Sequence, residues 1–138
     1  MSEKQISFKK IDAKLQSVQY QSLENMMNTY SINYTDQVEL KSFTDIDMEI
    51  IFKRHLFLEP RGVFDIGVEF IIQYIFIDQC KGSFLTKEEA NQFYEKNKKQ
   101  MLEDSQVGSK ASLLIAQLTS FQDLKPIIVP PMIKIKDK

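Results

Sequence analysis

The clearest alternation of apolar and polar positions lies in residues 63–77, VFDIGVEFIIQYIFI. Every even position from 64 to 76 is aromatic or β-branched, so these side chains would share one face of a strand. The odd positions start with Asp65, Gly67 and Glu69 and are then apolar except for Gln73, and the glycine can mark a bulge. A strand that is apolar on both faces needs cover on both sides. The pattern predicts a central strand, with helices on one side of its second half and a loop, a subunit or another polypeptide on the other.

Three further strands follow from the same period. Residues 5–20 alternate in pieces whose phase shifts, which predicts a long first strand with a β-bulge. As one strand, residues 37–59 would span ~75 Å, whereas a compact domain of this length has a radius of gyration near ~14 Å. The aspartate-containing stretch 44–47 favours a turn over a strand. We therefore predict separate strands over residues 32–43 and 47–59.

Before the central strand, the sequence Glu-Pro-Arg-Gly at residues 59–62 predicts a hairpin turn. After the central strand, the spacing of apolar residues changes from that of a strand to that of a helix. Thr86 and Glu89 form a capping box, and helical spacing predicts one helix from there to about Asp104 and another over about residues 109–121. Four strands followed by two helices predict an α+β fold with a four-stranded antiparallel sheet.

The three prolines within residues 123–135 exclude a helix there and predict an extended edge segment. A length of 138 residues corresponds to about one domain, so we expect a single domain over residues 1–138. Its ends, residues 1–5 and 134–138, are expected to be loose.

Composition removes several classes of function. The formal net charge of -1 provides no general field for nucleic acid or anionic membranes. The only cysteine, Cys80, cannot form an internal disulfide, which is typical of a cytosolic chain. No apolar run approaches the ~20 residues that a membrane helix needs. We therefore expect a cytoplasmic protein that binds neither nucleic acid nor membrane.

Few residues could carry catalysis or hold a metal. His55 is the only histidine and has no nucleophile motif beside it, and one Cys with one His cannot build a tetrahedral zinc site. Asp45, Asp47 and Glu49 would line one strand face, which favours a solvated face over a cation site. No phosphate-binding glycine pattern occurs. We expect no cofactor and no enzymatic activity, with a small-ligand enzyme based on His55 as an alternative.

Several apolar side chains fall outside the predicted core stripes. Phe43, Ile51 and Phe57 lie on the polar phase of their strands, and Phe84 and Leu85 lie in a connection. Exposed phenylalanine and methionine suit the binding of varied apolar segments. Cover by loops, by helices or by a second copy of the chain is the alternative interpretation.

Four stretches taken together resemble the SecB family of protein-export chaperones. They are ISFKKIDAKLQSVQYQ at 6–21, MEIIFKRHLFLEPRGVFDIGVEFIIQYIFI at 48–77, SKASLLIAQLTSF at 109–121 and LKPIIVPPMI at 124–133. The likeness lies in the order and pattern of the elements and covers about residues 6–133. It implies a cytosolic holdase that works without ATP, forms dimers or tetramers, and binds unfolded or extended polypeptides in apolar grooves.

By position, the resemblance suggests groove residues on the sheet and in the connections. These polypeptide-binding candidates are Phe43, Ile51, Phe57, Phe84, Leu85, Leu124 and Ile127. Two features differ from the export members of the family, which are strongly acidic and present carboxylates to the SecA motor. This chain has a net charge of -1, and its connection before the first helix is short. The alternative is therefore a SecB-fold adaptor or structural protein that binds one dedicated protein partner and has no general chaperone or export role.

Overall fold

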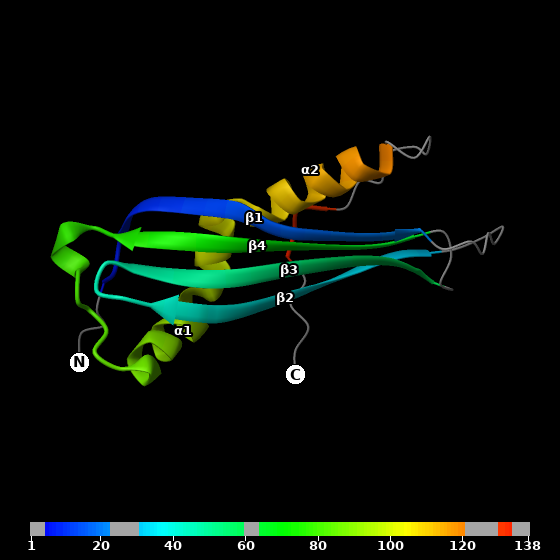
Figure 1. Ribbon diagram of the computed structural model, residues 1–138. Coiled ribbons are helices and arrows are strands. Elements are labelled where there is room, and N and C mark those ends of the chain that lie inside the picture. The colour runs from blue at the N-terminus through cyan, green and yellow to red at the C-terminus, as the bar shows by residue number, and fades with distance from the viewer. Residues whose placement is uncertain (1–4, 23–30, 60–63, 121–129, 134–138) are drawn as a thin grey trace.

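The computed structural model describes residues 5–22, 31–59, 64–120 and 130–133 (Figure 1). Four strands come first: β1 (Phe8–Ser22), β2 (Ser31–Phe43), β3 (Asp47–Glu59) and β4 (Phe64–Phe76). A short 3-10 helix, η1 (Asp78–Cys80), leads to α1 (Lys87–Ser105) and α2 (Val107–Ser120). The predicted α+β fold, with a four-stranded antiparallel sheet followed by two helices, is confirmed. The chain ends that were expected to be loose lie outside the described residues, apart from Gln5.

The sheet has the strand order β1-β4-β3-β2, and every neighbouring pair is antiparallel. The predicted central position of β4 is therefore confirmed. Its even-numbered side chains from Ile66 to Phe76 are all buried, because they face the two helices. Its odd-numbered side chains, such as Ile71 and Ile75, are half-buried on the opposite side, which we call the open face. The four strands thus form one layer and the helices the other.

The turn between β2 and β3 lies where the aspartates predicted it. The hydroxyl oxygen of Thr44 accepts hydrogen bonds from the backbone amides of Ile46 and Asp47, each at 3.2 Å. The same hydroxyl donates to the carboxylate of Asp47 at 2.7 Å. A side chain that bonds to the backbone two or three residues ahead stabilises a tight turn. This local chemistry divides the long alternating run into two strands.

Bulges decide which way several side chains point. The predicted irregularity in β1 is confirmed by register shifts against β4 between Phe8 and Lys10 and between Leu15 and Ser17. A further shift, in β2 between Leu40 and Ser42, was not predicted. The bulge suggested at Gly67 is wrong, because the register of β4 runs through this residue without a shift on both sides.

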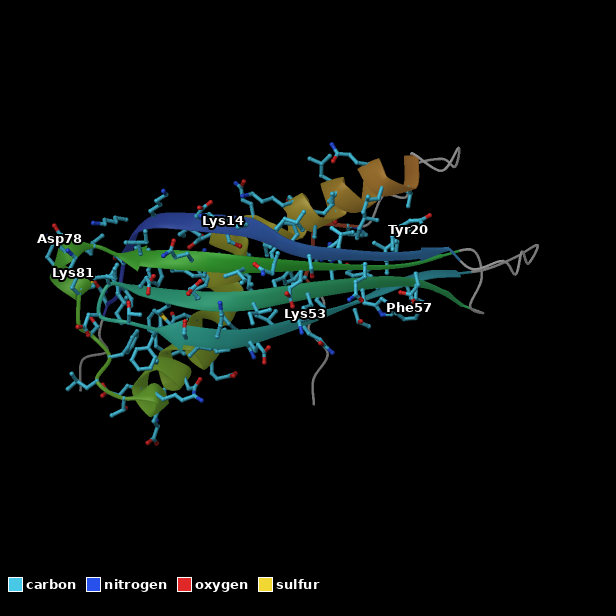
Figure 2. The ribbon with its side chains drawn as sticks, in the orientation of Figure 1. Lys14, Tyr20, Lys53, Phe57, Asp78 and Lys81 are labelled. Carbon is cyan, nitrogen blue, oxygen red and sulfur yellow. The ribbon has the colours of Figure 1, made fainter. Side chains whose placement is uncertain are left out.

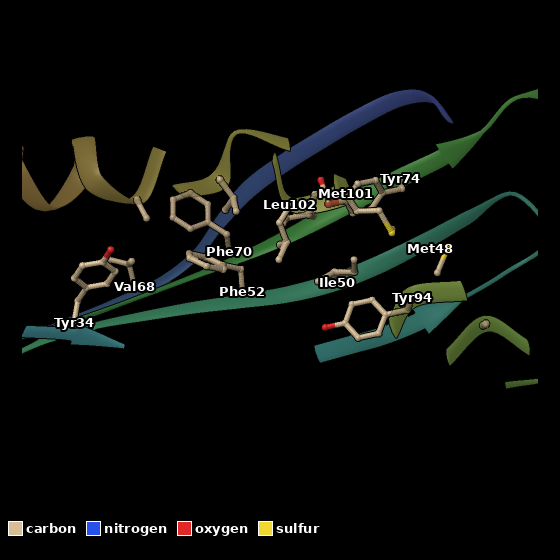
Figure 3. Packing of buried hydrophobic residues seen from close by; sticks show 14 of the residues in the cluster. Tyr34, Met48, Ile50, Phe52, Val68, Phe70, Tyr74, Tyr94, Met101 and Leu102 are labelled. Carbon is tan, nitrogen blue, oxygen red and sulfur yellow. Dashed lines mark hydrogen bonds between the residues drawn. The ribbon is translucent and has the colours of Figure 1, made fainter. Parts of the chain in front are cut away.

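The helices cover one face of the sheet. α1 begins as predicted, since the Thr86 side chain accepts a hydrogen bond from the Glu89 amide, and it contacts both edge strands, β1 and β2. α2 follows after the single residue Gln106, which adopts a left-handed backbone conformation, and it contacts β4. The core lies between these layers, and Figure 3 shows Phe52 and Phe70 at its centre.

Residues 130–133 form no strand in the structure, so the predicted edge position is wrong for this described part of the proline-rich segment. They lie instead on the helix side, where Met132 accepts a hydrogen bond from the Tyr34 hydroxyl. The prolines explain why these residues do not join the sheet, because proline lacks the amide hydrogen that strand pairing needs.

Candidate functional site

Two of the sequence-predicted binding residues, Ile51 and Phe57, lie on the open face of the sheet. Ile51 pairs with Glu39 on one side and Ile71 on the other. Phe57 comes from the same strand, β3 (Figure 2), and its ring packs against the His55 ring with centroids 5.3 Å apart. Both side chains are half-buried. Their predicted place on the polar phase of β3 is confirmed: Ile51 has the apolar neighbour Ile71, whereas Phe57 pairs with the polar residues Asn33 and Asp65.

Phe43 and Phe84 lie in the core instead. The β2 bulge moves Phe43 to the helix side, where it pairs with the fully buried Met48, so its placement on the polar phase is corrected. Its ring meets the Phe84 ring at 6.2 Å, and Phe84 also packs against Phe76 and Phe93. Phe84 is buried in the structure, although the sequence places it in a connection. This aromatic cluster closes the end of the core beside η1.

The remaining predicted residues fall in different places. Leu85 is 84% exposed and directly follows the buried Phe84. Leu124 and Ile127 lie outside the described residues. The structure therefore does not bring the five described candidates together on one surface: two face the open side, two pack in the core and one projects into solvent.

The structure places exposed apolar side chains elsewhere, on the helix side of edge strand β1. Leu15 is 48% exposed and Val18 is 37% exposed. They pair with Phe70 and Val68, which are buried, so all four side chains point to the same face. We call Leu15 and Val18 the β1 apolar edge. The sequence signal that could have placed Leu15 and Val18 on one face was the shift of phase within the first strand, because a bulge brings residues three apart onto one face.

The second helix adds apolar surface. α2 buries Ala111 and Ile115 fully and packs Leu114 and Leu118 partly against the core. Leu113 points outward and is 62% exposed. Leu113 is thus a further exposed aliphatic side chain, on the helix layer.

The edge strands also offer backbone hydrogen-bonding groups. β1 and β2 each pair on one side only within the four-stranded sheet. Natural sheets protect such edges with lysine, and β1 carries Lys9, Lys10 and Lys14. The β1 edge is therefore protected at its first half, whereas the β1 apolar edge follows in its second half.

The residues considered for catalysis or metal binding have structural partners. His55 forms a hydrogen bond with Asp65 on the open face. Asp47 bonds to Thr44 and to Gln73, the latter at 2.7 Å. Cys80 is buried, with its Sγ 3.6 Å from the backbone oxygen of Gln5. Among the described residues, no group of three acidic, histidine or cysteine side chains could hold a metal ion.

A hollow of about 350 Å³ lies on the open face above Gly67, where a side chain is missing from the surface. Its walls include Lys53, His55 and Glu69 from the central strands. Lys53 and Glu69 form an ion pair across these strands at 3.5 Å. The hollow is thus a polar depression in which the charged groups already have partners. No helix in the described part of the chain is long and apolar enough to cross a membrane.

A scan against protein-family models finds no match, and a search of curated proteins finds none either. Among solved structures, the chain is similar to Rv1957, a SecB-like chaperone of Mycobacterium tuberculosis, in complex with a ChAD peptide from the Rv1956 HigA1 antitoxin. The TM-score is 0.63 at 15% sequence identity, and the match covers 91% of this chain and 87% of that chain. Such a likeness concerns the order and packing of the elements. The chain has a SecB-like α+β fold.

Proposed function

We propose that the chain is a chaperone that binds extended or non-native polypeptide segments without nucleotide, as a non-enzymatic protein of the cytoplasm. The observation that carries this proposal is the β1 apolar edge, where Leu15 and Val18 stay 48% and 37% exposed on the face that otherwise forms the core. The SecB-like fold supports it, as does the peptide bound to the similar chaperone.

Apolar contact would supply the affinity. Each leucine- or phenylalanine-sized client side chain that becomes fully buried contributes about 1.5–3 kcal/mol. Several such side chains are needed, because ordering a flexible segment opposes binding. The neighbouring edge of β1 could add main-chain hydrogen bonds by strand addition, which recognises an extended backbone regardless of its sequence.

A dedicated adaptor that binds one protein partner is the second candidate. The similar chaperone was solved with a peptide from one antitoxin, and the β1 apolar edge of this chain consists of only two side chains. A small apolar surface favours a matched partner over many varied clients, because specificity then depends on the polar contacts around it.

The first experiment is the aggregation of a chemically unfolded client protein, measured by light scattering with and without this chain and without ATP. We expect suppression near stoichiometric amounts, and we expect Leu15→Asp with Val18→Asp to abolish it. These side chains are partly exposed, so the double variant should remain folded. Leu85→Asp is the matched control, since Leu85 is an equally large side chain that lies on the connection before α1.

Each outcome assigns the site differently. Loss of suppression in Leu85→Asp alone would move the binding site to the connection that the sequence suggested. No suppression by the unsubstituted chain would contradict the general chaperone and favour the dedicated adaptor, whose test is a single stoichiometric partner.

A further inference from the structure

Arg54 is a fully buried charge at the centre of the helix side of β3. Its Nε and Nη2 donate to the two carboxylate oxygens of Asp36 at 2.8 and 2.9 Å. Asp36 is also fully buried. Such a two-bonded pair compensates both charges, yet it uses only two of the five N–H groups of the guanidinium.

The other N–H groups reach parts of the chain that are distant in sequence. Nη1 lies 2.7 Å from the Ser112 hydroxyl and 3.2 Å from the Pro130 carbonyl oxygen, and Nη2 lies 3.1 Å from the Met132 carbonyl oxygen. The Tyr34 hydroxyl donates to the same Met132 oxygen at 2.9 Å. Arg54 thus ties residues 130–133 to the sheet through their backbone.

We call these groups the Arg54 site, which consists of Arg54, Asp36, Tyr34, Ser112 and Gly108. It recognises residues 130–133 as a peptide ligand would be recognised. The two carbonyl groups that it binds, those of Pro130 and Met132, are two residues apart, and the backbone bends between them so that both face Arg54. The Met132 side chain is 64% exposed, so it contributes little to this recognition.

One feature of the segment favours proline, and a second feature of the site requires close approach of its backbone. Pro130 and Pro131 are exposed and have no amide hydrogens to pair, and their rings restrict the backbone, so a segment with prolines at these positions loses less conformational freedom when it binds. The Pro131 carbonyl lies against Gly108, where an added Cβ would come within 2.0 Å of its oxygen. Only glycine leaves room for the peptide backbone at this point.

Residues 130–133 do not fill the space beside the Arg54 site. A cavity of about 640 Å³ remains between residues 131–133 and the helices. Leu102 of α1 and Gly108 at the start of α2 line it, with Lys98, Lys99 and Glu103 around them. A segment with larger apolar side chains than residues 130–133 would therefore fit beside the same backbone contacts.

We propose that the Arg54 site is a binding site for short proline-containing segments of other polypeptides, and that residues 130–133 occupy it as an internal, exchangeable ligand. The site goes beyond the chaperone function proposed above. It lies on the same face of the sheet as the β1 apolar edge, with Val68 of β4 between Val18 and Arg54. The two sites share no residue and are tested by different variants, so either can be disproved while the other stands.

The test uses the full-length chain and a fluorescein-labelled synthetic peptide with the sequence VPPMIK, that of residues 129–134. The internal segment competes at an effective concentration in the millimolar range. We therefore weaken it in the chain by Pro130→Ala with Pro131→Ala, which frees its backbone. Fluorescence anisotropy should show the peptide binding this variant at least about tenfold more tightly than the unsubstituted chain.

Two controls make the result specific. A peptide with alanine at both proline positions should bind at least about tenfold more weakly. Adding Gly108→Ala to the double variant should abolish binding, because the new Cβ occupies the place of a peptide carbonyl. Circular dichroism verifies that each variant is folded.

Failure of the peptide to bind the folded double variant would overturn the proposal, as would equal binding after Gly108→Ala. Exchange that occurs only between copies of the chain, detected as a dimer that the peptide does not dissociate, would overturn it as well.

Discussion

Arg54 and Asp36 illustrate at the residue scale how a buried charge depends on its partner. Arg54 occupies an even position of β3, in phase with the apolar side chains of the core, so the alternation alone places it on the buried face. The alternation does not predict that Asp36 is the partner of Arg54, because the two residues meet only through the β2–β3 register. The pair is retained in the core because each charge is compensated.

We predict that Arg54→Met lowers the free energy of unfolding by about 3–5 kcal/mol, since it leaves the Asp36 carboxylate buried without a cation. Arg54→Met combined with Asp36→Leu should recover much of this loss, because no buried charge then remains. Urea unfolding of the two single variants and the double variant gives the coupling energy. Equal losses in Arg54→Met and the double variant would contradict the expectation.

Tyr74 and Tyr94 link stability to alkaline pH. Burial raises the pKa of each phenol well above the ordinary value of 10.0. The Tyr74 hydroxyl donates to the Met101 carbonyl at 2.8 Å, whereas that of Tyr94 is buried without a hydrogen-bond partner in the described structure. Above pH 10 an unfolded chain releases these protons while the folded chain keeps them, so the free energy of unfolding should fall as the pH rises.

Denaturant unfolding measured at pH 8 and at several pH values above 10 should show this decline. Tyr74→Phe and Tyr94→Phe should each make the decline less steep, because one titrating group is removed. An unchanged slope in both variants would show that the buried tyrosines do not cause the alkaline loss.

At the scale of elements, strand phase was readable wherever alternation was regular. The bounds of β3 match the predicted residues 47–59, and β4 differs from its prediction by one residue at each end. The turn at 44–47 was predictable because aspartate is disfavoured in strands and favoured in turns. The β2 bulge was not predictable, since in a short alternating stretch an extra residue leaves either face of the sheet plausible for the residues after it. The bulge decides that Phe43 packs against the core.

The central position of β4 leads to a prediction for Phe70, which is buried against Phe52 across the β3–β4 pair. Phe70→Ala should lower the free energy of unfolding by about 3–5 kcal/mol, because it leaves a cavity in the core. Phe57→Ala is the matched control: the same truncation on the half-buried open face should cost clearly less. Thermal or urea unfolding measures both, and a small loss for Phe70→Ala would mean that β4 does not carry the core.

At the scale of the whole molecule, the two layers differ in what they leave uncovered. The helices lie on one side of the sheet (Figure 1) and bury the apolar face of the central strands, while Leu15 and Val18 of β1 stay exposed on that face. An edge strand with exposed aliphatic side chains favours pairing with another polypeptide. The partner can be a client or a second copy of the chain.

We predict a homo-oligomer, a dimer or a tetramer, whose native mass can be measured by mass spectrometry at micromolar concentration. Leu15→Asp with Val18→Asp should reduce this mass if the β1 apolar edge joins the subunits. An unchanged mass together with lost client binding would instead assign the edge to clients. A monomer for the unsubstituted chain would contradict the prediction.

The sequence by itself determined the strands, the helices, their order and the buried phase of β4, because these depend on local periodicity, turn chemistry and capping. It also indicated the SecB-like pattern. Only the tertiary structure decided that Phe84 is buried, that Leu15 and Val18 are exposed and that Arg54 holds residues 130–133. The exposure of a residue and its hydrogen-bond partners depend on which distant segments pack against it. Strand phase determines only the face of the sheet on which the residue lies.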